Sequence, residues 1–224
     1  MGISLEQVRT LRQRTGAGIA DCKKALVEAE GNEEKAVEII QKKGLAKVAK
    51  KAGAIAAEGM VHAYIHAGSR VGVLVEINCQ TDFVARNEEF KQFAQEIAMH
   101  IASEKPEYVR AEEITDAATA KQEEIFRAQL AEEEKQTGKA KPPQAIDGII
   151  AGKLKKWRRE SVLLDQEFIL SEDKKSVAAI QDELSAKIGE KISIRRFVRY
   201  ELGEGIEKKV SDLAADVAAT LAGN

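Results

Sequence analysis

Residues 60–78 read MVHAYIHAGSRVGVLVEIN, and this stretch decides the fold. Apolar side chains alternate with their neighbours from 60 to 66 and again from 71 to 77. A period of two is typical of extended strands. Residues 67–70, Ala-Gly-Ser-Arg, suit a turn between the two runs. The stretch therefore predicts a β-hairpin.

A strongly amphipathic helix is predicted directly after the hairpin. Asn87 is a favourable N-cap. The apolar residues that follow it share one helical face: Phe90, Phe93, Ala94, Ile97, Ala98 and Ile101. Residues 192–201 alternate again like a strand, and Gly203 and Gly205 end that pattern. We therefore expect a three-stranded antiparallel sheet packed by helices.

The residues before the hairpin predict a small helical bundle. Residues 1–43 contain three short helical patterns, and Ser4 with Gln7 has the spacing of a capping box. Leu5, Val8 and Leu11 recur along one face of the first helix. Asn32 is expected to cap the third helix and Gly44 to end it. So small a bundle has a marginal core, so we expect it to lean on another part of the molecule.

The second half of the chain predicts further helices. A charged helix at about 115–136 has few apolar anchors, namely Ile125 and Leu130. The next helix is marked by Ile146, Ile149, Ile150, Leu154 and Trp157, and another by Val177, Ile180, Leu184 and Ile188. A final amphipathic helix carries Val210, Leu213, Ala214, Val217 and Leu221. The expected fold is α+β, with a helical domain at 1–53, an α+β core at 54–202 and a C-terminal helical module at 203–224.

The charge balance excludes strong attraction to polyanions. Thirty-five basic residues face thirty-seven acidic ones, so the formal net charge is −2. Such a chain is not drawn as a whole to nucleic acid or to an anionic membrane surface. No run approaches the roughly 20 apolar residues that span a bilayer, and the first residues do not resemble an export signal. We expect a cytoplasmic protein without direct contacts to nucleic acid or membrane.

Few residues suggest covalent chemistry. The sequence has no phosphate-binding glycine loop, nucleophile elbow or H-E-x-x-H motif. His62 and His66 share a strand face, but about 13 Å of strand separates them, which is too far for one zinc ion. Cys22 lies on an apolar helix face. Neither Cys22 nor Cys79 belongs to a sequence motif with the spacing of metal ligands. We therefore expect no enzyme activity, no cofactor and no bound metal.

A basic run around Trp157 allows two interpretations. It consists of Lys153, Lys155, Lys156, Arg158 and Arg159. If the run binds RNA, the chain is a nucleic-acid-binding module whose RNA retention depends on salt. If Trp157 packs inward with the apolar side of its helix, the charges form a solvated helix face. The position of Trp157 on that apolar side favours the solvated face.

The segment Thr81-Asp82-Phe83-Val84 lies between the predicted hairpin and the Asn87-capped helix. Phe83 is a large ring beside a carboxylate in a chain with few aromatic residues. It either fills the gap between strand and helix or projects as a wedge for a partner's pocket. An exposed Phe could contribute roughly 2–3 kcal/mol when a partner buries it.

Three segments carry a resemblance to a known family. Asn78-Cys79-Gln80-Thr81-Asp82-Phe83-Val84-Ala85 resembles the signature of the elongation factor Ts family. The run Leu11-Arg12, then Thr15-Gly16-Ala17-Gly18 and Asp21-Cys22-Lys23-Lys24-Ala25-Leu26, is similar to the family's ubiquitin-associated-like domain. Gly203-Glu204-Gly205-Ile206-Glu207-Lys208 resembles the start of its C-terminal module. The three segments occur in the family's order.

The resemblance implies a function. Members of this family are guanine-nucleotide exchange factors of the GTPase elongation factor Tu. The resemblance implies that Thr81, Asp82, Phe83 and Val84 dislodge magnesium from the GTPase. It implicates Arg12, Ile19 and Lys23 more weakly, because the family docks its N-terminal domain on the GTPase's nucleotide-binding domain. The alternative is a scaffold that binds the GTPase and leaves nucleotide release unchanged.

One feature departs from the longer members of the family, which carry a duplicated core with an inserted coiled-coil protrusion. This chain has a single core copy and no sustained heptad pattern. We therefore expect no coiled-coil protrusion. A single half-core leaves a sheet edge or an apolar face to be covered, so we expect a homodimer that restores the two-copy arrangement.

Overall fold

The structure is a computed structural model that describes residues 3–50, 56–138 and 142–206. Its elements are α1 (Leu5–Thr15), α2 (Ile19–Glu28), α3 (Glu33–Lys50), β1 (Glu58–Ile65), β2 (Val71–Cys79), α4 (Asp82–Ala85), α5 (Glu88–Glu104), η1 (Ala111–Glu113), α6 (Asp116–Thr137), α7 (Pro143–Ser161), η2 (Leu163–Asp165), α8 (Val177–Ile188) and β3 (Ser193–Glu201). The expected α+β fold is confirmed. The helix expected at 210–221 lies outside the described residues.

The N-terminal bundle folds largely as its sequence predicts. The capping box at the start of α1 forms, with Ser4 Oγ accepting from Gln7 N at 3.1 Å and Gln7 Oε1 accepting from Ser4 N at 3.0 Å. The side chains that form the bundle core are Val8, Leu11, Cys22, Ala25, Leu26, Ala29 and Ala36. Leu5 does not join them, because it lies in the first turn of α1 and is 89% exposed. The expectation that Leu5 packs with Val8 and Leu11 was wrong.

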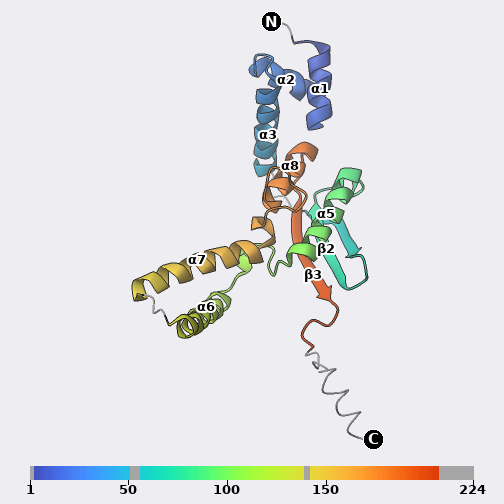
Figure 1. Cartoon of the computed structure of the whole chain (residues 1–224). Coiled ribbons are helices and arrows are strands. Elements are labelled where there is room, and N and C mark those ends of the chain that lie inside the picture. Colours follow the sequence, from blue (N-terminus) through green and yellow to red (C-terminus); the bar gives the residue numbers. More distant parts are fainter. Residues whose placement is uncertain (1–2, 51–55, 139–141, 207–224) are drawn as a thin grey trace, which may run out of the picture.

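The third helix is longer than its sequence suggests. Gly44 was expected to end it, yet α3 continues to Lys50. Gly44 instead marks the place where α3 packs against α8. The N-terminal bundle therefore contacts the core through the packing of α3 against α8, as Figure 1 shows.

The core is built on one face of the sheet. The strands lie in the order β1-β2-β3 and both pairs are antiparallel. The α5 helix packs on β1 and β2, and Asn87 caps it by accepting from Glu89 N at 2.7 Å. The face beneath α5 carries Val73, Val75, Ile77 and Cys79 of β2, which pack with Phe90, Phe93, Ile97 and Ile101 of α5. The period-two and helical patterns of the sequence thus meet in one core.

The opposite face of the sheet carries exposed apolar side chains beside an ion pair of Glu76 with Arg196. Leu74 of β2 pairs with Ala63 of β1 and with Val198 of β3, so these three residues form one row across this face. The exposed side chains of the face include Val61, Ile65, Leu74, Val198 and Tyr200. Their exposure shows that none of the described helices covers this face.

The α6 and α7 helices pack on each other and extend from the core as a pair (Figure 1). Lys153 Nζ lies 5.5 Å from the centre of the Phe126 ring, and Arg127 pairs with Asp147 at 3.2 Å. The lack of heptads predicted no coiled-coil protrusion, and the helices predicted at about 115–136 and around residues 146–157 both form. Within the described residues, no helix is long and apolar enough to cross a membrane.

Candidate partner-binding site

The segment 81–84 forms the start of a one-turn helix. Thr81 has extended backbone angles and is the N-cap of α4, with its hydroxyl accepting from Val84 N at 3.4 Å. Asn87 N donates to Val84 O at 3.0 Å, which closes the turn toward α5. A four-residue helix is not stable by itself, so its position depends on contacts with the core.

Neighbouring residues of α4 point in opposite directions. Val84 is 8% exposed and belongs to the core, whereas Phe83 is 80% exposed. Phe83 therefore does not fill the gap between strand and helix, and that interpretation was wrong. Asp82 lies beside it and pairs with Arg86 at 3.0 Å. Val84 anchors the turn while Phe83 presents its ring to the solvent.

A half-buried turn after α8 holds the start of this segment. Glu190 Oε2 accepts from the backbone N–H groups of Gln80 and Thr81, each at 3.1 Å. Glu190 Oε1 accepts from the Thr81 hydroxyl at 2.8 Å. Nothing in the local sequence pattern of 78–85 pointed to Glu190, because it lies on a distant part of the chain.

The N-terminal bundle presents a second surface. Arg12 and Ile19 are exposed and line one groove of about 590 Å³ together with Leu5 and Val8. Lys23 is exposed but does not line this groove. Leu5 is a residue that pattern reasoning assigned to the core, although its place in the first turn of α1 was a sign of exposure. The segment 81–84 lies outside the groove, so the predicted site residues form two separate surfaces.

His100 and the two cysteines occupy buried positions. His100 is buried, and its Nε2 lies 2.9 Å from Gln166 Oε1. Burial lowers the pKa of His100 below its ordinary value. Cys79 donates to Thr81 O at 3.1 Å, and burial raises the pKa of this thiol to about 11. Cys22 is buried in the core of the bundle, as its apolar face predicted.

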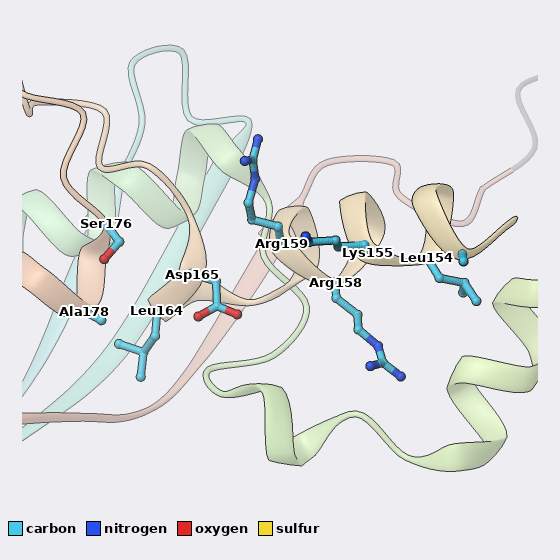
Figure 2. A pocket seen from close by; sticks show the side chains of 9 residues that line it. Leu154, Lys155, Arg158, Arg159, Leu164, Asp165, Ser176 and Ala178 are labelled. Atoms are coloured by element: carbon cyan, nitrogen blue, oxygen red, sulfur yellow. The ribbon is translucent and has the colours of Figure 1, made fainter. Parts of the chain in front are cut away.

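The basic run lies in the C-terminal half of α7, where Figure 2 shows its residues Lys155, Arg158 and Arg159. A pocket of about 680 Å³ is lined there by Ala151, Leu154, Lys155, Arg158, Arg159, Leu164, Asp165, Ser176 and Ala178. Arg158 and Arg159 point away from each other in Figure 2. Arg158 approaches Thr119 of α6 at 3.5 Å, and Trp157 is half-buried. Arg158 and Arg159 therefore do not converge on one point, although both line this pocket.

Comparison with known proteins gives a consistent result. The family model described as Elongation factor TS matches residues 6–204. The Elongation factor Ts of Desulforamulus reducens is 53% identical over 98% of both chains, and that of Carboxydothermus hydrogenoformans is 54% identical over 98% of both. The Elongation factor Ts of Alkaliphilus oremlandii is 49% identical over the whole of both chains. The chain therefore belongs to the elongation factor Ts family of translation elongation factors.

Proposed function

We propose that this protein is the guanine-nucleotide exchange factor of elongation factor Tu, and that Phe83 is the wedge that opens the GTPase. The observation that carries the proposal is the 80% exposure of Phe83 on an α4 turn anchored by Val84 and Thr81. Exposed large apolar side chains on anchored elements suit insertion into a partner's pocket. The factor acts in the cytoplasm and performs no covalent chemistry of its own.

Nucleotide exchange requires a certain binding free energy from the contacts of Phe83 and its neighbours with the GTPase. A GTPase holds its nucleotide through backbone N–H groups around the phosphates and through Mg²⁺. Linkage requires that a factor which weakens GDP binding also binds the empty GTPase more tightly by the same ratio. A thousandfold effect needs about 4 kcal/mol of differential contact. Burying the Phe83 ring supplies roughly 2–3 kcal/mol of it.

The neighbours of Phe83 supply the remainder. Asp82 is half-exposed and pairs with exposed Arg86, so little energy is lost when it turns to a partner. Its carboxylate can compete for the hydrogen-bond donors and the water that surround the magnesium ion. The groove at Leu5, Arg12 and Ile19 gives the GTPase a second contact, and this contact mainly positions the factor.

The experiment is stopped-flow release of fluorescent GDP from elongation factor Tu, with and without this chain. We expect strong acceleration by the native chain and its loss in Phe83→Ala and Asp82→Ala. Leu170→Ala is the matched control, because Leu170 is also exposed, at 50%, but lies outside both surfaces. If the native chain binds the GTPase and leaves the GDP release rate unchanged, the chain is a scaffold and the proposal is wrong.

We also propose that two copies pair through the uncovered face of the sheet. The row formed by Ala63, Leu74 and Val198 lies at the middle of this face, and Val61, Ile65 and Tyr200 extend it. Sheets that pack face to face bury such rows with a spacing of about 10 Å. A second copy offers the same apolar face, which suits a two-fold interface. Two half-cores would thereby form one sandwich.

A further inference from the structure

We propose that Glu190 is the positioning residue of the wedge: its carboxylate holds the Thr81 turn so that Phe83 faces the GTPase. This inference rests on the proposed function of Phe83. Glu190 is not itself placed on either partner-binding surface. It acts through Thr81, at the point where β2 ends and α4 begins.

The Glu190 carboxylate binds this turn through both of its oxygen atoms, and we call this contact the carboxylate clamp. Both Glu190 oxygens are used, one by the N–H groups of Gln80 and Thr81 and the other by the Thr81 hydroxyl. Hydrogen bonds to a charged acceptor are stronger than neutral ones. The three donors belong to two successive residues, so the clamp fixes the direction in which the chain leaves β2.

The Thr81 hydroxyl links the Glu190 carboxylate to the first turn of α4. It donates to Glu190 Oε1 at 2.8 Å and accepts from Val84 N at 3.4 Å. The first contact sets the rotamer of Thr81, and the second caps the helix that carries Phe83. Two further side-chain contacts lie at this turn: Cys79 Sγ donates to Thr81 O at 3.1 Å, and Asp82 forms an exposed ion pair with Arg86 that contributes little.

The residues on both sides of Glu190 are held in place by three contacts. Gly189 ends α8 in a left-handed conformation with φ 82°, and its N–H donates to Ser185 O at 2.8 Å. Ser185 Oγ accepts from Ile192 N at 3.2 Å on the other side of Glu190. Lys187 pairs with Glu89 of α5 at 2.9 Å. The turn that carries Glu190 is therefore tied to α8, to the start of β3 and to α5.

A purely structural role predicts a different outcome from a positioning role. If Glu190 only stabilised the fold, its loss would lower the unfolding midpoint and affect every activity equally. If Glu190 positions Phe83, its loss lowers the rate at which bound GTPase releases GDP. The N-terminal groove stays intact in that case, so the concentration of factor for half-maximal release changes little.

The test compares Glu190→Ala, Glu190→Gln and the control Glu172→Ala in the GDP-release assay. Glu172 is exposed and lies outside the clamp. We expect Glu190→Ala to lower the maximal release rate about tenfold, because small misplacements of a working group have large rate effects. Half-saturation is expected to shift less than about twofold. Glu190→Gln should fall between, because its amide oxygen still accepts from the two backbone N–H groups. A native maximal rate in folded Glu190→Ala would overturn the proposal.

A second measurement needs no GTPase. Trp157 is the single tryptophan, so Trp157→Phe with Phe83→Trp places one fluorophore at the wedge. We expect Glu190→Ala, or Glu190→Gln should the first variant fail to fold, to lower the fluorescence anisotropy of Trp at 83. Unchanged anisotropy in a folded variant would contradict the clamp. If the native chain fails to accelerate GDP release, the proposed function fails, while the anisotropy still tests the positioning.

Discussion

Gly44 of α3 lies directly against Ala186 of α8. A Cβ built on Gly44 would lie 2.7 Å from the Cβ of Ala186 and 2.9 Å from its carbonyl oxygen. Glycine inside a helix costs about 1 kcal/mol relative to alanine, and this close approach explains why glycine stands there. This contact joins the N-terminal bundle to the core. It therefore sets the angle between the groove of the bundle and the segment 81–84.

Gly44→Ala is expected to weaken the packing of α3 against α8. The added methyl meets backbone atoms of Ala186, so α3 and α8 must move apart at a cost of about 1–3 kcal/mol. Thermal unfolding should show a lower midpoint, and small-angle scattering should show a larger radius of gyration. The matched control is Gly148→Ala in α7, where nothing lies within 4 Å of the new Cβ. That change should stabilise α7 by about 0.5–1 kcal/mol, and a Gly44→Ala protein that is equally stabilised would refute the contact.

Two phenylalanines on adjacent elements should differ sharply in their contribution to stability. Phe83→Ala removes a side chain that is 80% exposed, so the free energy of unfolding should change by less than about 0.5 kcal/mol. Phe90→Ala removes a fully buried ring, which should cost about 3–5 kcal/mol. Urea denaturation of both variants checks this difference. A large loss in Phe83→Ala would mean that its ring packs in the core.

Leu74→Lys should separate the proposed dimer. Leu74 lies at the centre of the uncovered sheet face and is 46% exposed. A charge there costs little in a monomer but is desolvated in a face-to-face dimer. Sedimentation at micromolar concentration should show a dimer for the native chain and a monomer for Leu74→Lys. Leu170→Lys should remain dimeric, and a monomeric native chain would rule the dimer out.

The carboxylates of Glu76 and Glu201 should make the fold sensitive to acid. Hydrogen bonds from Arg195 and then Arg196 lower the pKa of Glu76 from 4.5 to about 2. Lys105, followed by Arg199, lowers the pKa of Glu201 from 4.5 to about 2. In the window between these values the unfolded chain binds more protons than the folded chain. Stability that is present above pH 4.5 is therefore lost as the pH falls toward about 2.

Glu76→Gln provides the measurement for this acid sensitivity. Denaturant unfolding at a series of pH values should show a shallower loss of stability below about pH 5 in the variant than in the native chain. The comparison isolates Glu76, because Glu201 and its partners are unchanged. An identical acid slope in the two proteins would show that the pKa of Glu76 is not depressed by its arginines.

Much of the fold was predictable because its signals are local. Alternation over 60–66 and 71–77 determined the hairpin, and Ser4, Asn32 and Asn87 cap the helices that follow them. A cap acts within three residues and a strand pattern within about eight, so both are visible in the sequence. The same holds for the buried face of α5, whose apolar spacing matched the observed core.

The exposure of Phe83 was not predictable in this way. The local pattern suited a plug and a wedge equally well, because a one-turn helix has too few residues to reveal which side is buried. Only the placement of Val84 in the core decided it. Leu5 shows the same limit, since its spacing matched Val8 and Leu11 while the first turn of α1 extends past the bundle core.

The sequence by itself thus determined the strands, the caps, the apolar faces and the family motif. The tertiary structure decided which of these faces meet. Gly44 reads locally as a helix end, yet it is a contact point for Ala186. Glu190 reads as one acidic residue among many, yet it holds Thr81 across 109 residues of chain. Such pairings depend on how whole elements pack in space, and no pattern within a few neighbouring residues records them.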